Sequence, residues 1–344
     1  MALKYFQTFA LFVSLLAVPA IACGGSATTP TQAPVVKTAT TESKAVEPPA
    51  KPADSAQATP TQPPAQAEAS KPTETFLGDV IEQDGILLSA LAVEDPTKPG
   101  ILYQADAGKK LVAIEIIVGN ISADKASVNP LSASLLDKEG FAYQPELGGR
   151  DGQIATLDLG PGEKVVGWVS FKVPTEAKLA SLKYKPNLFA GNAMQIGLVA
   201  APSGHTASKP SAERTKPQLA KLGDAVETNG VSLTAIKVDD PAKPGILYKQ
   251  EEGKKLIAVE VVLGNVSADK LSANPLFFYL VDTDGFVYTA ELGATDKQID
   301  TVELGKGEKV KGMVAFTIPA DAKVESVKFA LPFASSVVQT GLSK

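Results

Sequence analysis

Apolar and polar residues alternate along the chain in short runs, and this pattern predicts strands rather than helices. The clearest examples are two segments rich in β-branched residues, 110–118 (KLVAIEIIV) and 255–263 (KLIAVEVVL). Further strand candidates in the first half are Ile86–Val93, Leu131–Leu136, Phe141–Tyr143, Gln153–Leu157, Lys164–Val173 and Leu179–Tyr184. Glycine-containing turn signals separate these candidates, and no amphipathic stretch is long enough for a stable helix. Short strands at regular spacing without helices predict an all-β fold, a β-sandwich.

The same pattern of residues occurs twice in the chain. Leu77-Gly78-Asp79 returns as Leu222-Gly223-Asp224, and an offset of 145 residues then holds without a gap as far as Tyr184 and Phe329. About 58 of the 108 paired positions are identical. The chain is therefore a tandem duplication. We expect two domains, residues 76–199 and 222–344, joined by a polar linker, residues 200–221, in which His205 is expected to be a solvated residue.

The segment before the first copy has two parts. Residues 1–22 combine Lys4, an apolar run and small residues, the layout of a secretory signal peptide. Ala20-Ile21-Ala22-Cys23 resembles the lipobox of bacterial lipoproteins, which implies that Cys23 is lipidated and anchors the protein in a membrane. The alternatives are an ordinary signal peptide cleaved after Ala22 and an uncleaved anchor helix. Residues 23–75 are rich in Pro, Ala and Thr, and we expect them to form a disordered tether.

Composition and charge exclude several classes of function. The chain has 344 residues, a net charge of −5, one Cys and one His. These counts exclude an intrachain disulfide, a Cys/His zinc site, a Ser-His-Asp triad and a Cys-His dyad. The acidic balance argues against nucleic acid as a partner. Asp239-Asp240 and Glu251-Glu252 are adjacent carboxylate pairs, but the first copy has Asp106-Ala107 in place of the second pair. We interpret these residues as part of a solvated acidic surface and expect no catalytic residues, no cofactor and no metal site.

Four short motifs carry a resemblance to a known family. They are the strand ends Gly119-Asn120 and Gly264-Asn265, an Asp-x-x-Gly-Phe-x-Tyr turn, a Gly-x-Gly-Glu-Lys-Val strand entry and a closing Val/Ile-Pro. Together they resemble an extracellular bacterial family of immunoglobulin-like domains of unknown function, common in surface lipoproteins. The motifs are also similar to those of the secreted mycobacterial immunoprotective antigen. The resemblance implies immunoglobulin-like sandwiches on the cell exterior and supplies no catalytic residues.

One pair of loops is the candidate binding site. The loop from Asp95 to Tyr103 and its twin from Asp240 to Tyr248 each contain two prolines, a glycine, a charge pair and an aromatic residue. The candidate binding residues are Asp95, Lys98, Tyr103, Asp240, Lys243 and Tyr248. The alternative is a proline-stiffened crossover that packs Ile101 or Ile246 and the tyrosine over the edge of the core.

Two other motifs have a structural and a functional interpretation. Asp282-Thr283-Asp284-Gly285 begins like a calcium loop but lacks the later oxygen ligands, so we predict a hairpin turn there. Asn120-Ile121-Ser122 and Asn265-Val266-Ser267 match glycosylation sequons, and in a bacterial chain we interpret them as strand-end turns. Trp168 corresponds to Met313 in the second copy, which indicates a packing position rather than a specific ligand contact.

We therefore expect a non-catalytic lipoprotein on the extracellular face of a bacterial membrane. A lipid anchor and a tether would present two immunoglobulin-like modules for binding or adhesion, with a cell-wall polymer or a surface protein as partner. The alternative is an accessory or sensor subunit that binds a solute or an ion for a membrane complex.

Overall fold

The computed structural model describes residues 74–344, apart from 101–102, 105, 187–191, 212–213, 247 and 332–336. The predicted signal peptide, Cys23 and nearly all of the predicted tether lie outside the described residues. The described residues belong to one compact unit. Within them, no helix has the length and apolar character needed to cross a bilayer.

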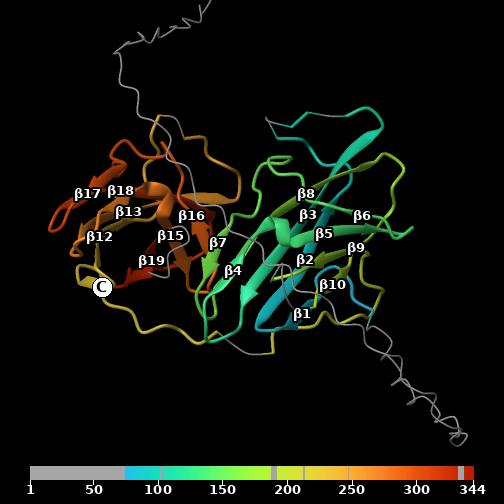
Figure 1. Ribbon diagram of the computed structural model, residues 1–344, viewed down its shortest axis with the longest axis horizontal. Helices are drawn as coiled ribbons and strands as arrows, with labels where there is room; N and C mark the ends of the chain where they lie inside the picture. Colours follow the sequence, from blue (N-terminus) through green and yellow to red (C-terminus); the bar gives the residue numbers. More distant parts are fainter. Residues whose placement is uncertain are drawn as a thin grey trace, which may run out of the picture. The chain divides into compact units, whose positions relative to one another are not determined.

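The first copy folds into short antiparallel strands (Figure 1). Its described elements are β1 (Val80–Gln83), β2 (Ile86–Glu94), β3 (Lys109–Asn120), β4 (Ala126–Val128), the 3-10 helix η1 (Pro130–Ser132), β5 (Ala133–Asp137), β6 (Ala142–Tyr143), β7 (Leu157–Leu159), β8 (Lys164–Pro174), β9 (Leu179–Tyr184) and β10 (Met194–Gly197). They form one sheet in the order β1-β2-β3-β8, a second in the order β10-β9-β5-β6, and a small β4-β7 ladder.

The second copy repeats this arrangement strand for strand (Figure 1). Its elements are β11 (Ala225–Thr228), β12 (Val231–Asp239), β13 (Lys254–Asn265), β14 (Leu271–Ala273), η2 (Pro275–Phe277), β15 (Phe278–Asp282), β16 (Val287–Thr289), β17 (Val302–Leu304), β18 (Lys309–Pro319), β19 (Val324–Ala330) and β20 (Val337–Gly341). The sheets run β11-β12-β13-β18 and β16-β15-β19-β20, with a β14-β17 ladder. The predicted all-β fold, two tandem immunoglobulin-like β-sandwiches, is confirmed.

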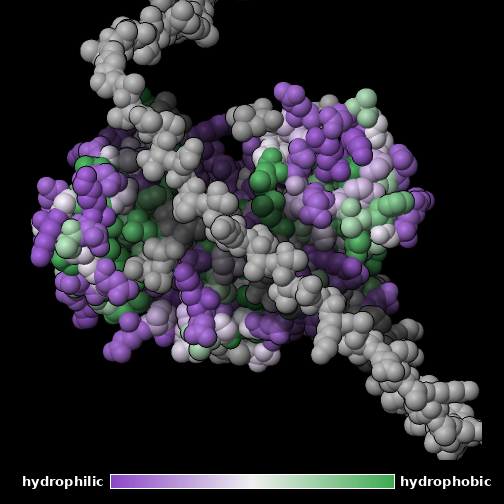
Figure 2. Space-filling view, viewed as in Figure 1, coloured by the Kyte–Doolittle hydropathy of each residue, from purple (hydrophilic) through white to green (hydrophobic). Residues whose placement is uncertain are grey.

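Strand alternation places the hydrophobic core between the sheets of each sandwich. In β3 the side chains of Val112, Ile114, Ile116 and Val118 are fully buried, while Glu115 on the opposite face is only partly buried. Successive residues of a strand point to opposite faces of its sheet, so one apolar face of β3 supplies the core. Polar side chains cover much of the visible surface of both sandwiches, with apolar groups between them (Figure 2).

A register shift at the same place in both copies turns one apolar residue outward. The β2–β3 ladder shifts between Ala90 and Ala92, and the β12–β13 ladder shifts at the equivalent position. Such a β-bulge adds one residue to one strand and redirects its side chain. Leu91 and Ile236, the residues at the two bulges, are 40% and 39% exposed.

Most predicted strands are present, and two predictions were wrong in position. β9 spans the predicted residues, and β2, β3 and β8 differ from prediction by one or two residues at their ends. The segment predicted as a strand from Leu131 instead begins with η1, because Asn129 caps the turn by accepting the Leu131 N–H and Pro130 fixes the first position. The strand predicted at Gln153–Leu157 lies farther along, as β7. The short strands β1, β4 and β10 were not predicted.

Candidate functional site

The loop after β2 is attached to its own sheet by charge and backbone contacts. Asp95 forms an ion pair with Lys110 on β3 at 2.8 Å, and the Thr97 N–H donates to the Leu111 carbonyl. Farther along the loop, the Gly100 N–H donates to the Gly149 carbonyl. Lys98 lies between these attached positions and is exposed. The Asp95–Pro96 and Asp240–Pro241 peptide bonds are cis. The ion pair and the two backbone hydrogen bonds fix the base of the first candidate loop, and its lysine faces solvent.

The tyrosine at the end of this loop lies over β8 rather than in solvent. Tyr103 is half-buried, and Lys172 Nζ lies 5.2 Å from the centre of its ring. The same lysine pairs with Asp106 at 3.1 Å and with Glu146 at 3.4 Å. Burial raises the pKa of Tyr103, and the hydrogen bond to Asp106 raises the pKa of Lys172. Tyr103 is thus part of a charged cluster on the outer face of the sheet.

The second candidate loop has the same base and a more exposed tip. Asp240 pairs with Lys255 at 2.9 Å, and the Gly245 N–H donates to the Ala294 carbonyl at 2.8 Å. Ile246 at the tip is 94% exposed, which is at odds with the alternative in which this residue packs over the core edge.

The tyrosine of the second loop packs against the sheet, as the alternative of a proline-stiffened crossover predicts. Tyr248 packs against a small cluster of Leu256, Ala294 and Ala315, and its hydroxyl lies 3.0 Å from Thr317 Oγ1. Lys243 is exposed, as Lys98 is. The loop therefore holds its tyrosine down and presents its lysine and isoleucine.

A second cluster beside the first loop exists in copy 1 alone. Arg150 lies over the Trp168 ring, 3.7 Å from its centre, and donates to Glu94 at 2.8 and 3.0 Å and to Thr97 at 3.1 Å. The hydrogen bonds from Arg150 and Thr97 lower the pKa of Glu94.

Copy 2 has a threonine, Thr295, where copy 1 has the arginine, and Met313 in place of the tryptophan. Trp168 is therefore a packing partner, as the Trp-to-Met exchange indicates. Sequence reasoning missed Arg150; the signal was that Arg150 and Trp168 both change between two otherwise similar copies.

The Asp-x-x-Gly-Phe-x-Tyr motif is a hairpin turn in both copies. Asp137 Oδ1 accepts the N–H groups of Glu139 and Phe141, and its Oδ2 accepts the hydroxyl of Tyr143 at 2.7 Å. Asp282 makes the same three contacts in copy 2. Because both carboxylate oxygens already accept hydrogen bonds, the turn has a structural explanation. The predicted hairpin, β15 to β16, is confirmed.

The two sequon asparagines lie buried at the ends of strands. Asn120 is 1% exposed, and its amide donates to the carbonyls of Asp124 and Leu159 at 2.7 and 3.0 Å. Asn265 makes the equivalent bonds and is also 1% exposed. Each amide ties a strand end to a neighbouring ladder, which confirms the strand-end interpretation.

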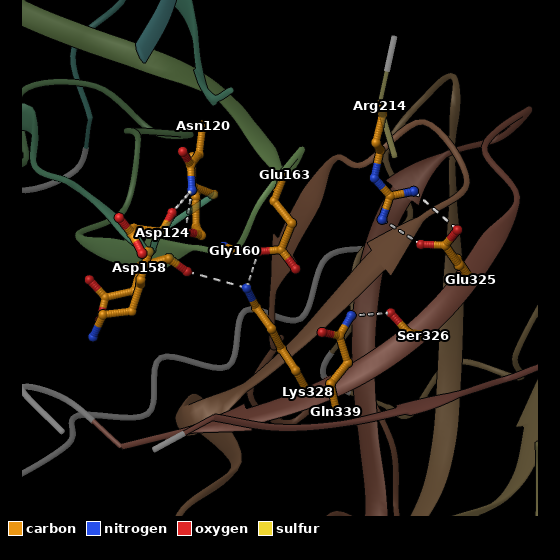
Figure 3. Close-up of polar contacts among 12 residues, drawn as sticks. Asn120, Asp124, Asp158, Gly160, Glu163, Arg214, Glu325, Ser326, Lys328 and Gln339 are labelled. Carbon is orange, nitrogen blue, oxygen red and sulfur yellow. Dashed lines mark hydrogen bonds and ion pairs between the residues drawn. The ribbon is translucent and has the colours of Figure 1, made fainter. Parts of the chain in front are cut away.

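A buried ion pair joins the two copies. Lys328 on β19 pairs with Glu163 in the turn before β8, and their side chains are 3% and 4% exposed (Figure 3). Lys328 also donates to the Asp158 carbonyl at 3.2 Å, while Glu163 accepts the Gly160 N–H at 2.8 Å. Charges buried to this degree need a partner and further hydrogen bonds, and both are present. The contact fixes β19 against the turn between β7 and β8.

Apolar contacts surround this ion pair. Val281 and Val287 of copy 2 are buried together with the core of copy 1, and Tyr279 packs against the same core. Lys164 Nζ lies 4.2 Å from the centre of the Phe286 ring. The two sandwiches therefore share a continuous buried contact, which sequence reasoning did not predict.

The linker takes part in this junction. Arg214 forms a bidentate ion pair with Glu325 on β19, at 3.0 and 2.6 Å (Figure 3). A cavity of about 930 Å³ lies beside it, lined by residues that include Asn120, Lys164, Lys209, Arg214, Thr283 and Asp284. No group of three or more potential metal-ligating side chains occurs in the described part of the chain.

The linker histidine is an exposed residue, as expected, but its ring also makes contacts with copy 1. His205 Nε2 lies 2.7 Å from Asp79 Oδ1, its side chain is 23% exposed, and its ring meets Phe76 edge to face. Burial favours a higher pKa for Asp79, but the hydrogen bonds from His205 and the Phe76 N–H outweigh it and lower that pKa. Ser211 adds a contact to Glu82 on β1. The linker is attached to copy 1 by side-chain hydrogen bonds that composition does not indicate.

The fold and these contacts define a protein of two tandem immunoglobulin-like β-sandwich domains joined by a buried polar contact. The chain belongs to the family described as Domain of unknown function (DUF4352), whose model matches residues 77–194 and 220–338. The family resemblance expected from the motifs is confirmed. A comparison with curated proteins finds no significant match.

Solved structures similar to part of this chain come from several bacteria. The secreted protein MPT63 of Mycobacterium tuberculosis has a TM-score of 0.29 and 12% identity over 37% of this chain and 95% of its own. The yjhA protein of Bacillus subtilis has a TM-score of 0.29 and 19% identity over 36% of this chain and 98% of its own. The ycdA protein of the same organism has a TM-score of 0.30 and 13% identity over 35% of this chain, and the match spans only 38% of ycdA.

Proposed function

We propose that the protein is a non-catalytic, lipid-anchored surface protein of bacteria that binds a cell-wall polymer or a surface protein through its paired loops. One observation carries the binding role: Ile246 is 94% exposed at the tip of a loop whose base is fixed. The Asp240–Lys255 ion pair and the Gly245–Ala294 hydrogen bond hold that base. A rigid loop loses little conformational entropy on binding, and an exposed apolar side chain on it gains contact area.

Lipid anchoring rests on the residues around Cys23. A diacylated cysteine supplies two acyl chains, which give stable membrane attachment where one chain gives marginal binding. The test is metabolic labelling of the full chain with a palmitate analogue in a bacterium, followed by fractionation. We expect label on the wild type, and we expect Cys23→Ala to lose the label and leave the membrane fraction. A Cys23→Ala protein that stays with the membrane would contradict the anchor.

The binding role is tested on residues 24–344, which retain both hydrophobic cores. Fluorescently labelled protein is incubated with intact bacterial cells and with purified cell-wall sacculi, and the bound fraction is measured. We expect Ile246→Ser to weaken binding by about tenfold, the loss typical of a central interface residue. Leu276→Ser, a matched control at a residue that is 46% exposed on η2, should bind like the wild type. Equal binding by the two variants would contradict a role of this loop in binding.

The alternative, a solute-binding accessory or sensor subunit of a membrane complex, is supported by the cavity at the junction. Its volume of about 930 Å³ lies within the range of small-molecule sites. The cations Lys164, Lys209 and Arg214 outnumber the carboxylates Glu163 and Asp284 in its lining. A thermal-shift screen against anionic metabolites discriminates the two functions. A ligand that raises the unfolding temperature of the wild type and not of Lys209→Ala would favour this alternative.

A further inference from the structure

The junction between the two copies is made of two different surfaces. Copy 1 contributes what we call the turn face, which consists of Asp158, Glu163 and Lys164. Copy 2 contributes what we call the hairpin face, which consists of Tyr279, Val281, Phe286, Val287 and Lys328. Because the copies share one fold, each also carries the surface that it does not use in the junction. The chain therefore has a second hairpin face, on copy 1, and a second turn face, on copy 2.

The ion-pair residues, the stacking lysine and the turn phenylalanine of the junction are retained on these second faces. Glu308 and Lys309 stand on copy 2 where Glu163 and Lys164 stand on copy 1, and both are exposed. Phe141 of copy 1 corresponds to Phe286 and is 61% exposed. Its counterpart Phe286 lies under the Lys164 side chain of the other copy, which shows what covers such a residue within the same chain.

The second hairpin face also carries the cation of the ion pair. Lys183 on β9 corresponds to Lys328 on β19, and it is partly exposed where Lys328 is buried. Both members of the buried pair, Lys328 and Glu163, therefore have a counterpart of the same chemistry.

The second faces are also arranged as in the junction. Glu308 accepts the Gly305 N–H at 2.7 Å, as Glu163 accepts the Gly160 N–H at 2.8 Å. The N–H of Phe141 donates to its turn aspartate at 2.9 Å, matching the 2.8 Å of Phe286 in copy 2. The glutamate side chain and the backbone of the phenylalanine thus make the same local hydrogen bonds in the free faces as in the occupied ones.

We propose that a second copy of this chain occupies these faces, so that the turn face of copy 2 docks on the hairpin face of copy 1 in the next molecule. Glu308 then pairs with Lys183, and Lys309 lies over Phe141, which repeats the internal junction between molecules. The two surfaces differ, so the contact is heterologous and extends head to tail into a row unless the rotation closes a ring.

The contact between molecules is weaker than the internal one. Ser134 replaces Tyr279, and Ala180 replaces Glu325, so the apolar contact is smaller and the ion pair with Arg214 has no counterpart. Association is therefore concentration-dependent. The proposal needs neither the lipid anchor nor the loops with Ile246, and its outcome is separate from that of the proposed function.

Charge reversal tests the pairing of the two faces. Residues 24–344 are studied by sedimentation velocity at physiological ionic strength, at concentrations up to about 1 mM, where weak specific contacts are populated. We expect the wild type to form larger species as concentration rises. Lys183→Glu alone and Glu308→Lys alone each place like charges opposite one another, and we expect each to lower the association constant by about tenfold or more. Lys249→Glu, a control at an exposed loop lysine, should associate like the wild type.

Mixing the two variants distinguishes this contact from any other. A Glu308→Lys molecule presents a lysine to the glutamate of a Lys183→Glu molecule, and the other two faces form the wild-type pair, so the mixture should regain association. Carbodiimide cross-linking of mixed ¹⁴N and ¹⁵N protein should join Lys183 to Glu308 between molecules. Far-UV circular dichroism and the double variant on one chain, which restores complementarity, verify that the variants fold.

Three results would each overturn the proposal. The wild type remains monomeric over the whole concentration range, or it associates and neither reversal changes the association constant, or the mixture and the double variant stay as weak as the single variants.

Discussion

Replacing Lys328 by methionine should strongly destabilise the contact between the two sandwiches. The side chains of Lys328 and Glu163 are 3% and 4% exposed, so the substitution leaves a carboxylate buried without its cation. Breaking a buried pair by removing one partner costs about 3–5 kcal/mol, whereas a pair exposed to solvent contributes about 0–1 kcal/mol. We therefore expect Lys328→Met to lower the free energy of unfolding by about 3–5 kcal/mol.

The assay is urea unfolding of residues 24–344, followed by far-UV circular dichroism and by the fluorescence of Trp168, which reports on copy 1 alone. The duplication provides the matched control, because Lys183→Met removes the equivalent lysine at a partly exposed site and should change stability by less than about 0.5 kcal/mol at low protein concentration. The double variant Lys328→Met/Glu163→Gln removes both charges and should recover most of the loss. If Lys328→Met and Lys183→Met unfold alike, the reasoning from burial is refuted.

Three further predictions concern single contacts. Arg150→Met removes the cation 3.7 Å from the centre of the Trp168 ring and should lower the free energy of unfolding by about 0.5–2 kcal/mol. Trp168 is the only tryptophan, so its fluorescence emission should shift. An unchanged spectrum would show that the contact does not form in solution. The pKa of Tyr143 is raised from 10.0 to about 12, so the folded state keeps a proton that the unfolded state loses, and stability should fall as pH rises through this range. Tyr143→Phe should flatten that alkaline loss, and an identical pH profile would contradict it. Asn120→Ala removes the buried hydrogen bond to the Leu159 carbonyl and the part-buried one to the Asp124 carbonyl. It should lower the thermal midpoint, by about 1–3 kcal/mol in free energy, whereas no shift would contradict the role of this amide.

The strand pattern predicted the sandwich because alternation over long strands such as β3 depends on local sequence alone. The short edge strand β1 was missed because four partly buried residues give too weak an alternation to distinguish a strand from a loop. The start of β5 was misplaced because the Asn129–Pro130 cap overrides the apolar run that follows it. The place of β1 at the sheet edge and the turn residues before β5, rather than the hydrophobic pattern, determine where these two strands lie.

The junction could not be predicted from the sequence. Glu163 and Glu308 stand in the same local sequence, and so do Lys328 and Lys183, yet only Glu163 and Lys328 are buried against each other. No pattern within one copy distinguishes the residue that pairs from the one that stays exposed. That choice depends on how the linker brings the copies together, and the linker is itself fixed by contacts such as Arg214–Glu325 that join distant segments.

The attachment of the linker has a consequence for aggregation. β1 is an edge strand of its sheet, and a bare edge offers unpaired backbone groups to which another chain can add a strand. Ser208 of the linker accepts the Val80 N–H at 2.8 Å and donates to the Val80 carbonyl at 2.7 Å, so it occupies both outward-facing groups of that residue. Release of Ser208 from β1, for example after a protease cut in the linker, would therefore leave these backbone groups unpaired. It would expose the edge of the sheet and make the domain a template to which another chain can add a strand.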